Sequence, residues 1–188
     1  LWKMAVAIGE MAAELHLPLY FVGGLVRDAL MHKSPTDLDM VVEGDAIALA
    51  MALQKKYGGH AHVHERFGTA KWGLETAVWQ KIAGDGTQIT QMNTDELPDS
   101  IDFITARAEF YTKPTVLPEV ESGSIKLDLH RRDFTINTLA VRLDGAHLGE
   151  LIDFYNGLRD LENKTIRVLH SLSFVDDPTR ILRGLRLG

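Results

Sequence analysis

The sequence predicts an α/β fold, because amphipathic-helix and buried-strand patterns alternate from the first residues onward. Apolar residues recur at helical spacing over residues 2–15. The apolar run at residues 19–22 then predicts a short buried strand, and a second helical pattern follows over residues 25–31. We expect the first helix to pack on the sheet that these strands build. The chain of 188 residues has room for one ordinary domain, or for one domain and the start of another.

The same alternation continues through the rest of the chain. A strand is expected at residues 37–42, and Asp45 is placed to cap a helix over residues 46–57 that Gly58 and Gly59 end. Residues 84–100 and 111–124 are expected to be loops. The remaining predicted elements are strands at 60–64, 100–104, 151–154 and 165–169, a hairpin of 69–74 with 77–82, and helices after Asp133, at 157–161 and from Asp177.

Composition excludes several kinds of site and of protein. The chain has no cysteine, which excludes disulfides, thiolate chemistry and cysteine-ligated zinc. The formal net charge of -6 argues against a protein that holds nucleic acid by charge alone. No apolar run approaches the length of a membrane span, so we expect a cytoplasmic protein with no membrane partner. Because the first residue is not Met and the last residues continue a helical pattern, we expect a fragment of a longer protein.

Two stretches near the N-terminus point to phosphate chemistry. Gly23 and Gly24 fall on the turn between a strand and a helix, where backbone amides can cradle a phosphate, although two glycines alone are a weak signal. Asp37 and Asp39 alternate with apolar residues, so in a strand both carboxylates share one face. Paired carboxylates favour a divalent cation such as Mg²⁺. The alternative is a glycine-rich turn followed by a surface strand.

The roles of a third carboxylate and of a pattern of alternating histidines remain open. Asp102 lies in the strand at 100–104 and would complete a carboxylate cluster only if that strand lies beside the strand of Asp37 and Asp39. The alternating histidines at 60, 62 and 64 would share one strand face, but ligands in one extended line suit tetrahedral geometry poorly.

Arginines are concentrated late in the chain. Arg131 and Arg132 precede the helix that Asp133 could cap, where they can neutralise a triphosphate, or else pair with Asp133 or Asp128 at the surface. Arg180, Arg183 and Arg186 recur every three residues and form one ridge of the last helix. Ile181, Leu182 and Leu185 are expected to pack elsewhere. The alternative for the ridge is a solvated helix face.

Taken together, these stretches resemble the class II tRNA nucleotidyltransferases, the CCA-adding enzymes, and the related bacterial poly(A) polymerases. The resemblance runs from residue 19 to residue 188. It is carried by Gly-Gly-x-Val-Arg-Asp at 23–28, Asp-x-Asp at 37–39, Val-Val-Glu-Gly-Asp at 41–45, His-Glu-Arg-Phe-Gly-Thr-Ala at 64–70, Asp-Phe at 102–103 with Ala-Arg at 106–107, Arg-Arg-Asp-Phe-Thr-Ile-Asn at 131–137, and Asp-Pro-x-Arg at 177–180.

The resemblance implies a polymerase β-like nucleotidyltransferase head, with a mixed sheet and flanking helices, over residues 1–150. The start of an all-helical, nucleotide-selecting neck would follow over residues 151–188. In the family's pattern Asp37 and Asp39 hold the catalytic Mg²⁺, and Asp102 is the third catalytic carboxylate. The residues implied to bind the nucleotide are Gly23, Gly24, Arg27, Arg132, Asp177, Arg180, Arg183 and Arg186.

The implied activity is transfer of CMP, AMP or both from CTP or ATP to the 3′ end of tRNA, which the family holds mainly through further domains. Poly(A) synthesis and a nucleotide-binding module without turnover are the alternatives. Asp177 as an acceptor and Arg180 as a donor would match the amino group and ring nitrogen that cytosine and adenine share. Asp176 stands where the family usually has Glu, which puts positioning of Arg180 in doubt, and Gly184 weakens the last helix by ~1 kcal/mol.

Overall fold

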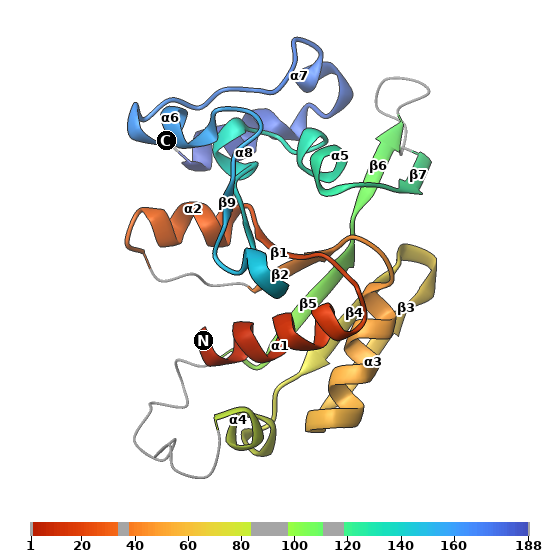
Figure 1. Ribbon diagram of the computed structural model, residues 1–188. Coiled ribbons are helices and arrows are strands. Elements are labelled where there is room, and N and C mark those ends of the chain that lie inside the picture. The colour runs from red at the N-terminus through yellow and green to blue at the C-terminus, as the bar shows by residue number, and fades with distance from the viewer. Residues whose placement is uncertain (1, 34–37, 84–97, 111–118, 188) are drawn as a thin grey trace.

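The computed structural model describes residues 2–33, 38–83, 98–110 and 119–187, and its centre is a seven-stranded mixed sheet (Figure 1). Across the sheet the strand order is β3-β4-β5-β2-β1-β8-β9. A separate two-stranded ribbon pairs β6 with β7. The strands are β1 (Leu19–Val22), β2 (Asp39–Val42), β3 (His60–His64), β4 (Thr69–Gly73), β5 (Ser100–Thr105), β6 (Arg107–Phe110), β7 (Glu119–Ser122), β8 (Ala140–Arg142) and β9 (Leu151–Ile152).

Strands β2 and β5 form the parallel pair of the sheet, and the other pairings are antiparallel. In the parallel pair Asp39 lies opposite Asp102. The condition set for Asp102, that its strand lies beside the strand of Asp39, is therefore met. Asp37 lies outside the described residues.

Helices lie on both sides of the sheet, with α1, α3 and α4 on one side and α5 on the other (Figure 1). Their bounds are α1 (Trp2–Glu14), α2 (Gly24–Leu30), α3 (Ala46–Tyr57), α4 (Thr76–Ala83), α5 (Ile125–His130), α6 (Gly157–Glu162), α7 (Ser173–Asp176) and α8 (Thr179–Leu187). Short 3-10 turns occur at η1 (Glu65–Phe67), η4 (Thr135–Asn137) and η5 (Gly145–His147). No helix within the described ranges is long and apolar enough to cross a bilayer.

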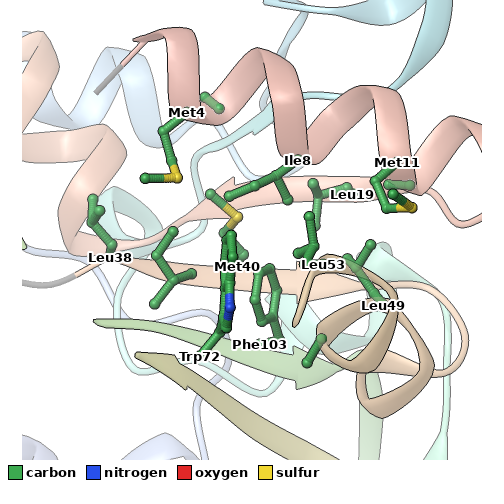
Figure 2. Close-up of a cluster of buried hydrophobic side chains, with 14 of the residues drawn as sticks. Met4, Ile8, Met11, Leu19, Leu38, Met40, Leu49, Leu53, Trp72 and Phe103 are labelled. Atoms are coloured by element: carbon green, nitrogen blue, oxygen red, sulfur yellow. The ribbon is translucent and has the colours of Figure 1, made fainter. Parts of the chain in front are cut away.

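The main hydrophobic core fills the space between the sheet and helices α1 and α3 (Figure 2). Met4 and Ile8 of α1 and Leu49 and Leu53 of α3 pack on the strand residues Met40, Phe103 and Trp72. Because neighbouring residues of a strand point to opposite faces, these residues fix the orientation of the residues between them. Asp39 and Asp102 therefore belong to the opposite face, the one that Leu129 of α5 packs against.

Several predicted local features are confirmed. Asp45 caps α3 by accepting hydrogen bonds from the backbone amides of Ile47 and Ala48, at 3.0 and 2.9 Å. Gly58, where α3 ends, has φ 88°, which favours glycine. The helices predicted over 2–15, 46–57 and 157–161, and the strands at 19–22, 60–64 and 100–104, form within two residues of their predicted ends.

The predicted hairpin of 69–74 with 77–82 is wrong. Residues 69–73 form β4, which pairs with β3 and β5, whereas residues 76–83 form α4. Val78 and Trp79 of α4 are buried while Gln80 and Lys81 are exposed, so the spacing of apolar residues is helical. The short run of apolar residues fitted both periods, and contact with α1 selected the helix.

Three other predictions need correction. Of the predicted loop at 111–124, residues 119–122 form β7, and residues 111–118 lie outside the described part, as do residues 84–97 of the other predicted loop. The helix expected after Asp133 is the single 3-10 turn η4. The strand expected at 165–169 is one isolated bridge between Phe134 and Val168. Both short elements are held by the amide of Thr135, which donates to the carbonyl of Arg167.

The division of the chain at residue 150 remains a prediction. Strand β9, Leu151–Ile152, pairs with β8 and is the last strand of the sheet. From α6 onward the described chain is helical or irregular.

The contact between α1 and the end of β8 yields a stability prediction. A Cβ added to Gly9 would lie 1.9 Å from the carbonyl oxygen of Leu143, so helix and backbone touch there. In an open helix Gly→Ala stabilises by ~1 kcal/mol. We expect Gly9→Ala instead to lower the free energy of unfolding by at least ~2 kcal/mol, because α1 has to move away from the sheet.

Urea denaturation measures this effect. Ala13→Gly, in the same helix, is the matched comparison and is expected to cost only ~1 kcal/mol from helix propensity. A stabilised Gly9→Ala variant would contradict the close packing of α1.

Candidate functional site

A cavity of about 550 Å³ lies between the Gly23-Gly24 turn, the start of β2, the segment 132–137 and α8. Its lining is rich in charged and polar groups. The lining residues are Val22, Gly24, Leu25, Arg27, Asp28, Asp39, Arg132, Asp133, Asn137, Arg183, Arg186 and Leu187. The structure thus brings together six residues predicted from the sequence: Gly24, Arg27, Asp39, Arg132, Arg183 and Arg186.

The glycine turn forms one wall of this cavity. Gly23 has φ 67° and ψ -129°, a conformation that residues with a Cβ rarely adopt. A Cβ at this position would also lie 2.7 Å from Nη1 of Arg132. Glycine is therefore required for two reasons: it makes the turn from β1 into α2, and it leaves room for the guanidinium of Arg132.

The two predicted carboxylates that the structure describes, Asp39 and Asp102, lie opposite each other on adjacent strands. Asp39 is exposed and lines the cavity, whereas Asp102 lies one strand further and does not. The Nζ atom of Lys71 on β4 is 3.0 Å from Oδ2 of Asp102. Both partners are about half exposed, at 50% and 42%, so the pair is an open surface contact that a cation or a substrate can displace.

The donor set fits a hard divalent cation. Asp39 and Asp102 offer carboxylate oxygens from neighbouring positions of one sheet face, and Mg²⁺ is commonly bound by one or two carboxylates together with substrate phosphates. Among the described residues there is no group of three or more His, Cys, Asp or Glu that could hold a metal ion. The histidines of β3 form no such site in that part of the chain, and His60 pairs with Glu75 at 2.8 Å.

The arginine ridge of α8 faces the rest of the protein. Arg180 is only 3% exposed: Nη2 donates to the carbonyl of Arg131 at 2.9 Å, and Nη1 donates to the hydroxyl of Ser173. Arg183 donates through Nε to Asp133 at 3.0 Å and through Nη2 to Asp177 at 2.8 Å. A fully solvated ridge, the alternative considered above, is therefore wrong.

The apolar residues of α8 do not pack as expected. Ile181, Leu182 and Leu185 are 51, 69 and 76% exposed, because the arginines occupy the face that docks on the rest of the chain. Asp177 and Arg180 do not line the cavity. Asp177 accepts from the backbone amide of Thr179 at 3.0 Å, so it starts the helix as predicted.

Sequence reasoning missed Asn137, and it expected Asp133 to cap a helix or to pair with Arg131 or Arg132, not with Arg183. Nη1 of Arg27 donates to Oδ1 of Asn137 at 2.6 Å, and Nδ2 of Asn137 donates to Oδ1 of Asp133 at 2.9 Å. Asp133 in turn accepts from Arg183. These contacts join the glycine turn to α8 along one wall of the cavity. The only sequence signal was the place of both residues within the stretch 131–137.

Comparison with known proteins finds relatives along most of the chain. The model of a family described as the Poly A polymerase head domain matches residues 19–167. The A-adding tRNA nucleotidyltransferase of Geobacter sulfurreducens is 44% identical over 179 residues, 95% of this chain and 18% of that protein. That of Halalkalibacterium halodurans is 43% identical over 180 residues, 95% of this chain and 37% of that protein. The CC-adding tRNA nucleotidyltransferase of Deinococcus radiodurans is 37% identical over 178 residues, 90% of this chain and 40% of that protein.

Solved structures share the fold. The apo form II of a CCA-adding enzyme has a TM-score of 0.83 and 40% identity, covering 98% of this chain and 39% of that chain. A tRNA nucleotidyltransferase complexed with a primer tRNA and an incoming ATP analog has a TM-score of 0.74 and 42% identity, covering 95% of this chain and 43% of that chain. The predicted head fold, with a mixed sheet and flanking helices, is confirmed. The chain spans less than half the length of each of these relatives.

The contacts of Asp177 yield a pH prediction. Burial raises the pKa of this carboxyl, but hydrogen bonds from Thr179 and Arg183 outweigh burial, so its pKa lies below the ordinary 3.8. A carboxylate with a lowered pKa in the folded state stabilises the fold above its unfolded pKa, and this stabilisation is lost as the pH falls through the lowered value.

We expect Asp177→Asn to lower the free energy of unfolding at neutral pH by about 0.5–1 kcal/mol, a small effect because Arg183 is 40% exposed and solvent screens the pair. The difference from the wild type should shrink as the pH falls below 3.8. Urea denaturation at a series of pH values measures it. A difference that stays constant down to the acid limit would show that the ionised carboxylate of Asp177 contributes nothing.

Proposed function

Because the chain belongs to the poly(A) polymerase head-domain family, we propose that this protein transfers CMP, AMP or both from CTP or ATP to the 3′ end of tRNA. The observation that carries the proposal is the cavity, in which four arginines face an exposed carboxylate, Asp39. The relatives support the acceptor, since they are named as tRNA nucleotidyltransferases that add A, CC or CCA.

The reaction is a nucleotidyl transfer. The 3′ hydroxyl loses its proton, for which Asp102 is the acceptor in this proposal, and its oxygen attacks the α-phosphorus. The bond from this phosphorus to the bridging oxygen breaks, and pyrophosphate leaves. Arg27, Arg132, Arg183 and Arg186 balance the charge of the triphosphate, because guanidinium groups match phosphate oxygens in pairs. The glycine turn lets the triphosphate approach the backbone of Gly23 and Gly24 closely.

Asp37 and Asp39 hold Mg²⁺ in this proposal, and Asp102 is the third catalytic carboxylate. The bound cation supplies Lewis-acid stabilisation of the charge on the phosphate oxygens. Asp102 is one strand away from Asp39 and can orient the attacking hydroxyl once Lys71 releases it.

Nucleotide choice belongs to α8 in this proposal. Asp177 would accept from the amino group of cytosine or adenine, and Arg180 would donate to the adjacent ring nitrogen. Uracil and guanine present the opposite order of donor and acceptor. Since Arg180 is bonded to Ser173 and to the carbonyl of Arg131, base recognition requires it to exchange at least one of these bonds. We place the protein in the cytoplasm, where its acceptor would be available.

One other function has an observation in its favour. The matching family model is described as a poly A polymerase head domain, so addition of AMP to other RNA 3′ ends uses the same head. The acceptor, not the chemistry, distinguishes the two functions. A nucleotide-binding module without turnover is the remaining alternative, and a retained Asp39 beside four cavity arginines argues against it.

The role of Asp39 can be tested in the full-length protein. We expect Asp39→Asn to reduce nucleotide incorporation into tRNA by at least ~100-fold with little change in the melting temperature, because Asn keeps the shape of this exposed side chain but removes its charge. Glu75→Gln, which alters an exposed carboxylate remote from the cavity, is the matched control and should retain full activity. Incorporation that survives Asp39→Asn would remove the proposed metal role.

Acceptor and nucleotide preference are tested together. We expect incorporation of CTP, ATP or both into tRNA lacking its 3′-terminal nucleotides, at least ~10-fold faster than incorporation of UTP or GTP, because only cytosine and adenine share the donor and acceptor order. A 3′-labelled extension assay with each nucleotide measures it. Long runs of A on unrelated RNA would favour poly(A) synthesis, whereas binding of ATP without any extension would favour the module without turnover.

A further inference from the structure

We propose that Asp128 is the positioning residue that aims Arg132 at the triphosphate. This inference rests on the proposed function, in which Arg132 binds the nucleotide. Asp128 is not a lining residue of the cavity, and its side chain is fully buried in α5.

The carboxylate of Asp128 accepts hydrogen bonds from three residues. Its Oδ1 accepts from Arg131, through Nη2 at 2.8 Å and Nε at 3.1 Å, and from the backbone amide of Arg107 at 3.4 Å. Its Oδ2 accepts from Nη2 of Arg132 at 3.1 Å. A buried carboxylate is stable only when it is paired and hydrogen-bonded, so this set of donors is obligatory.

The guanidinium of Arg132 depends on this carboxylate for its orientation. Among the described residues, Asp128 is the only hydrogen-bond partner of the guanidinium of Arg132, whose Nε is buried without a partner there. Nη1 lies over Gly23 at the cavity wall. Because a guanidinium is planar and rigid, the hydrogen bond from Nη2 to Asp128 also determines the direction in which Nη1 points.

Charge provides a second reason for a carboxylate at this position. Arg131 and Arg132 are neighbours on the chain, and their guanidinium groups share the single negative charge of Asp128. The shared carboxylate offsets the repulsion between the two arginines. It therefore allows Arg132 to stay beside the glycine turn, where a triphosphate would bind.

Asp128 also lies close to the contact between α8 and residue 131. The carbonyl of Arg131, whose guanidinium Asp128 holds, accepts from Arg180. A variant at residue 128 is therefore expected to affect stability as well as nucleotide binding. The experiment has to separate the two effects.

Asp128→Asn preserves shape but not charge. The side-chain amide of Asn has one carbonyl oxygen, which accepts hydrogen bonds, and one NH2 group, which only donates and so cannot pair with an arginine. We expect the full-length Asp128→Asn protein to show a KM for ATP, and a dissociation constant for ATP measured by calorimetry, that are at least ~10-fold higher, with kcat changed less than ~3-fold.

Asp144→Asn is the matched control. Asp144 is also buried and also pairs with an arginine, accepting from Arg142 at 3.0 Å, but it lies after β8 away from the cavity. We expect Asp144→Asn to lower the melting temperature and to leave the KM for ATP within ~2-fold of the wild-type value. An equal rise of KM in both variants would show that loss of stability, not orientation, causes the effect.

A double-mutant cycle with Arg132→Ala tests whether Asp128 acts through Arg132. In the Arg132→Ala background, Asp128→Asn should change the dissociation constant for ATP by less than ~2-fold, whereas in the Arg131→Ala background the ~10-fold effect should persist. The same ~10-fold loss in the Arg132→Ala background would overturn the proposal. A wild-type protein that extends no RNA would instead refute the proposed function, and the calorimetric cycle would still decide the role of Asp128.

Discussion

The in-register parallel pairing of β2 with β5 is the constraint on which the site depends. It places Asp39 directly opposite Asp102 on the adjacent strand. A shift of one residue would turn one of the carboxylates into the core, against α1 and α3. Met40 and Phe103 prevent this shift, because both fill the core from the same two strands (Figure 2). The hydrophobic core therefore determines the geometry of the charged site on the other face of the sheet.

Around this pair, charged groups are held by bonds between segments that are distant in sequence. Asn137 connects Arg27 to Asp133, and Asp133 connects to Arg183 on α8. The buried carboxylate of Asp128 accepts hydrogen bonds from the guanidinium groups of Arg131 and Arg132. Three arginines of the cavity, Arg27, Arg132 and Arg183, donate hydrogen bonds to a carboxylate or to an amide oxygen. Their guanidinium groups are therefore oriented before any ligand binds. Such preorganisation reduces the cost of ordering long side chains on binding.

Much of the fold could be predicted because it follows from local signals. The cap at Asp45, the glycine stop at Gly58 and the alternation of β3 each depend on a few neighbouring residues. The failures fall where local signals are ambiguous. The segment 76–83 is too short for its apolar spacing to distinguish a strand from a helix. The turn after Asp133 is shaped by the hydrogen bond from the amide of Thr135 to the carbonyl of Arg167. Arg180 could not be placed, because the same spacing of arginines fits a solvated ridge and a docked one.

By itself, the sequence determined the order of most helices and strands, the family, and the list of residues with the chemistry for nucleotide transfer. Only the tertiary structure decided which of those residues meet. It grouped Arg27, Arg132, Arg183 and Arg186 around one cavity and buried Arg180. It also selected Asp128 as the partner of Arg132, which the sequence had left as an alternative, and revealed Asn137 as the partner of Arg27. The physical reason is that periodicity and capping act over a few residues, whereas ion pairs depend on strand register and helix docking, which bring together residues far apart in the chain.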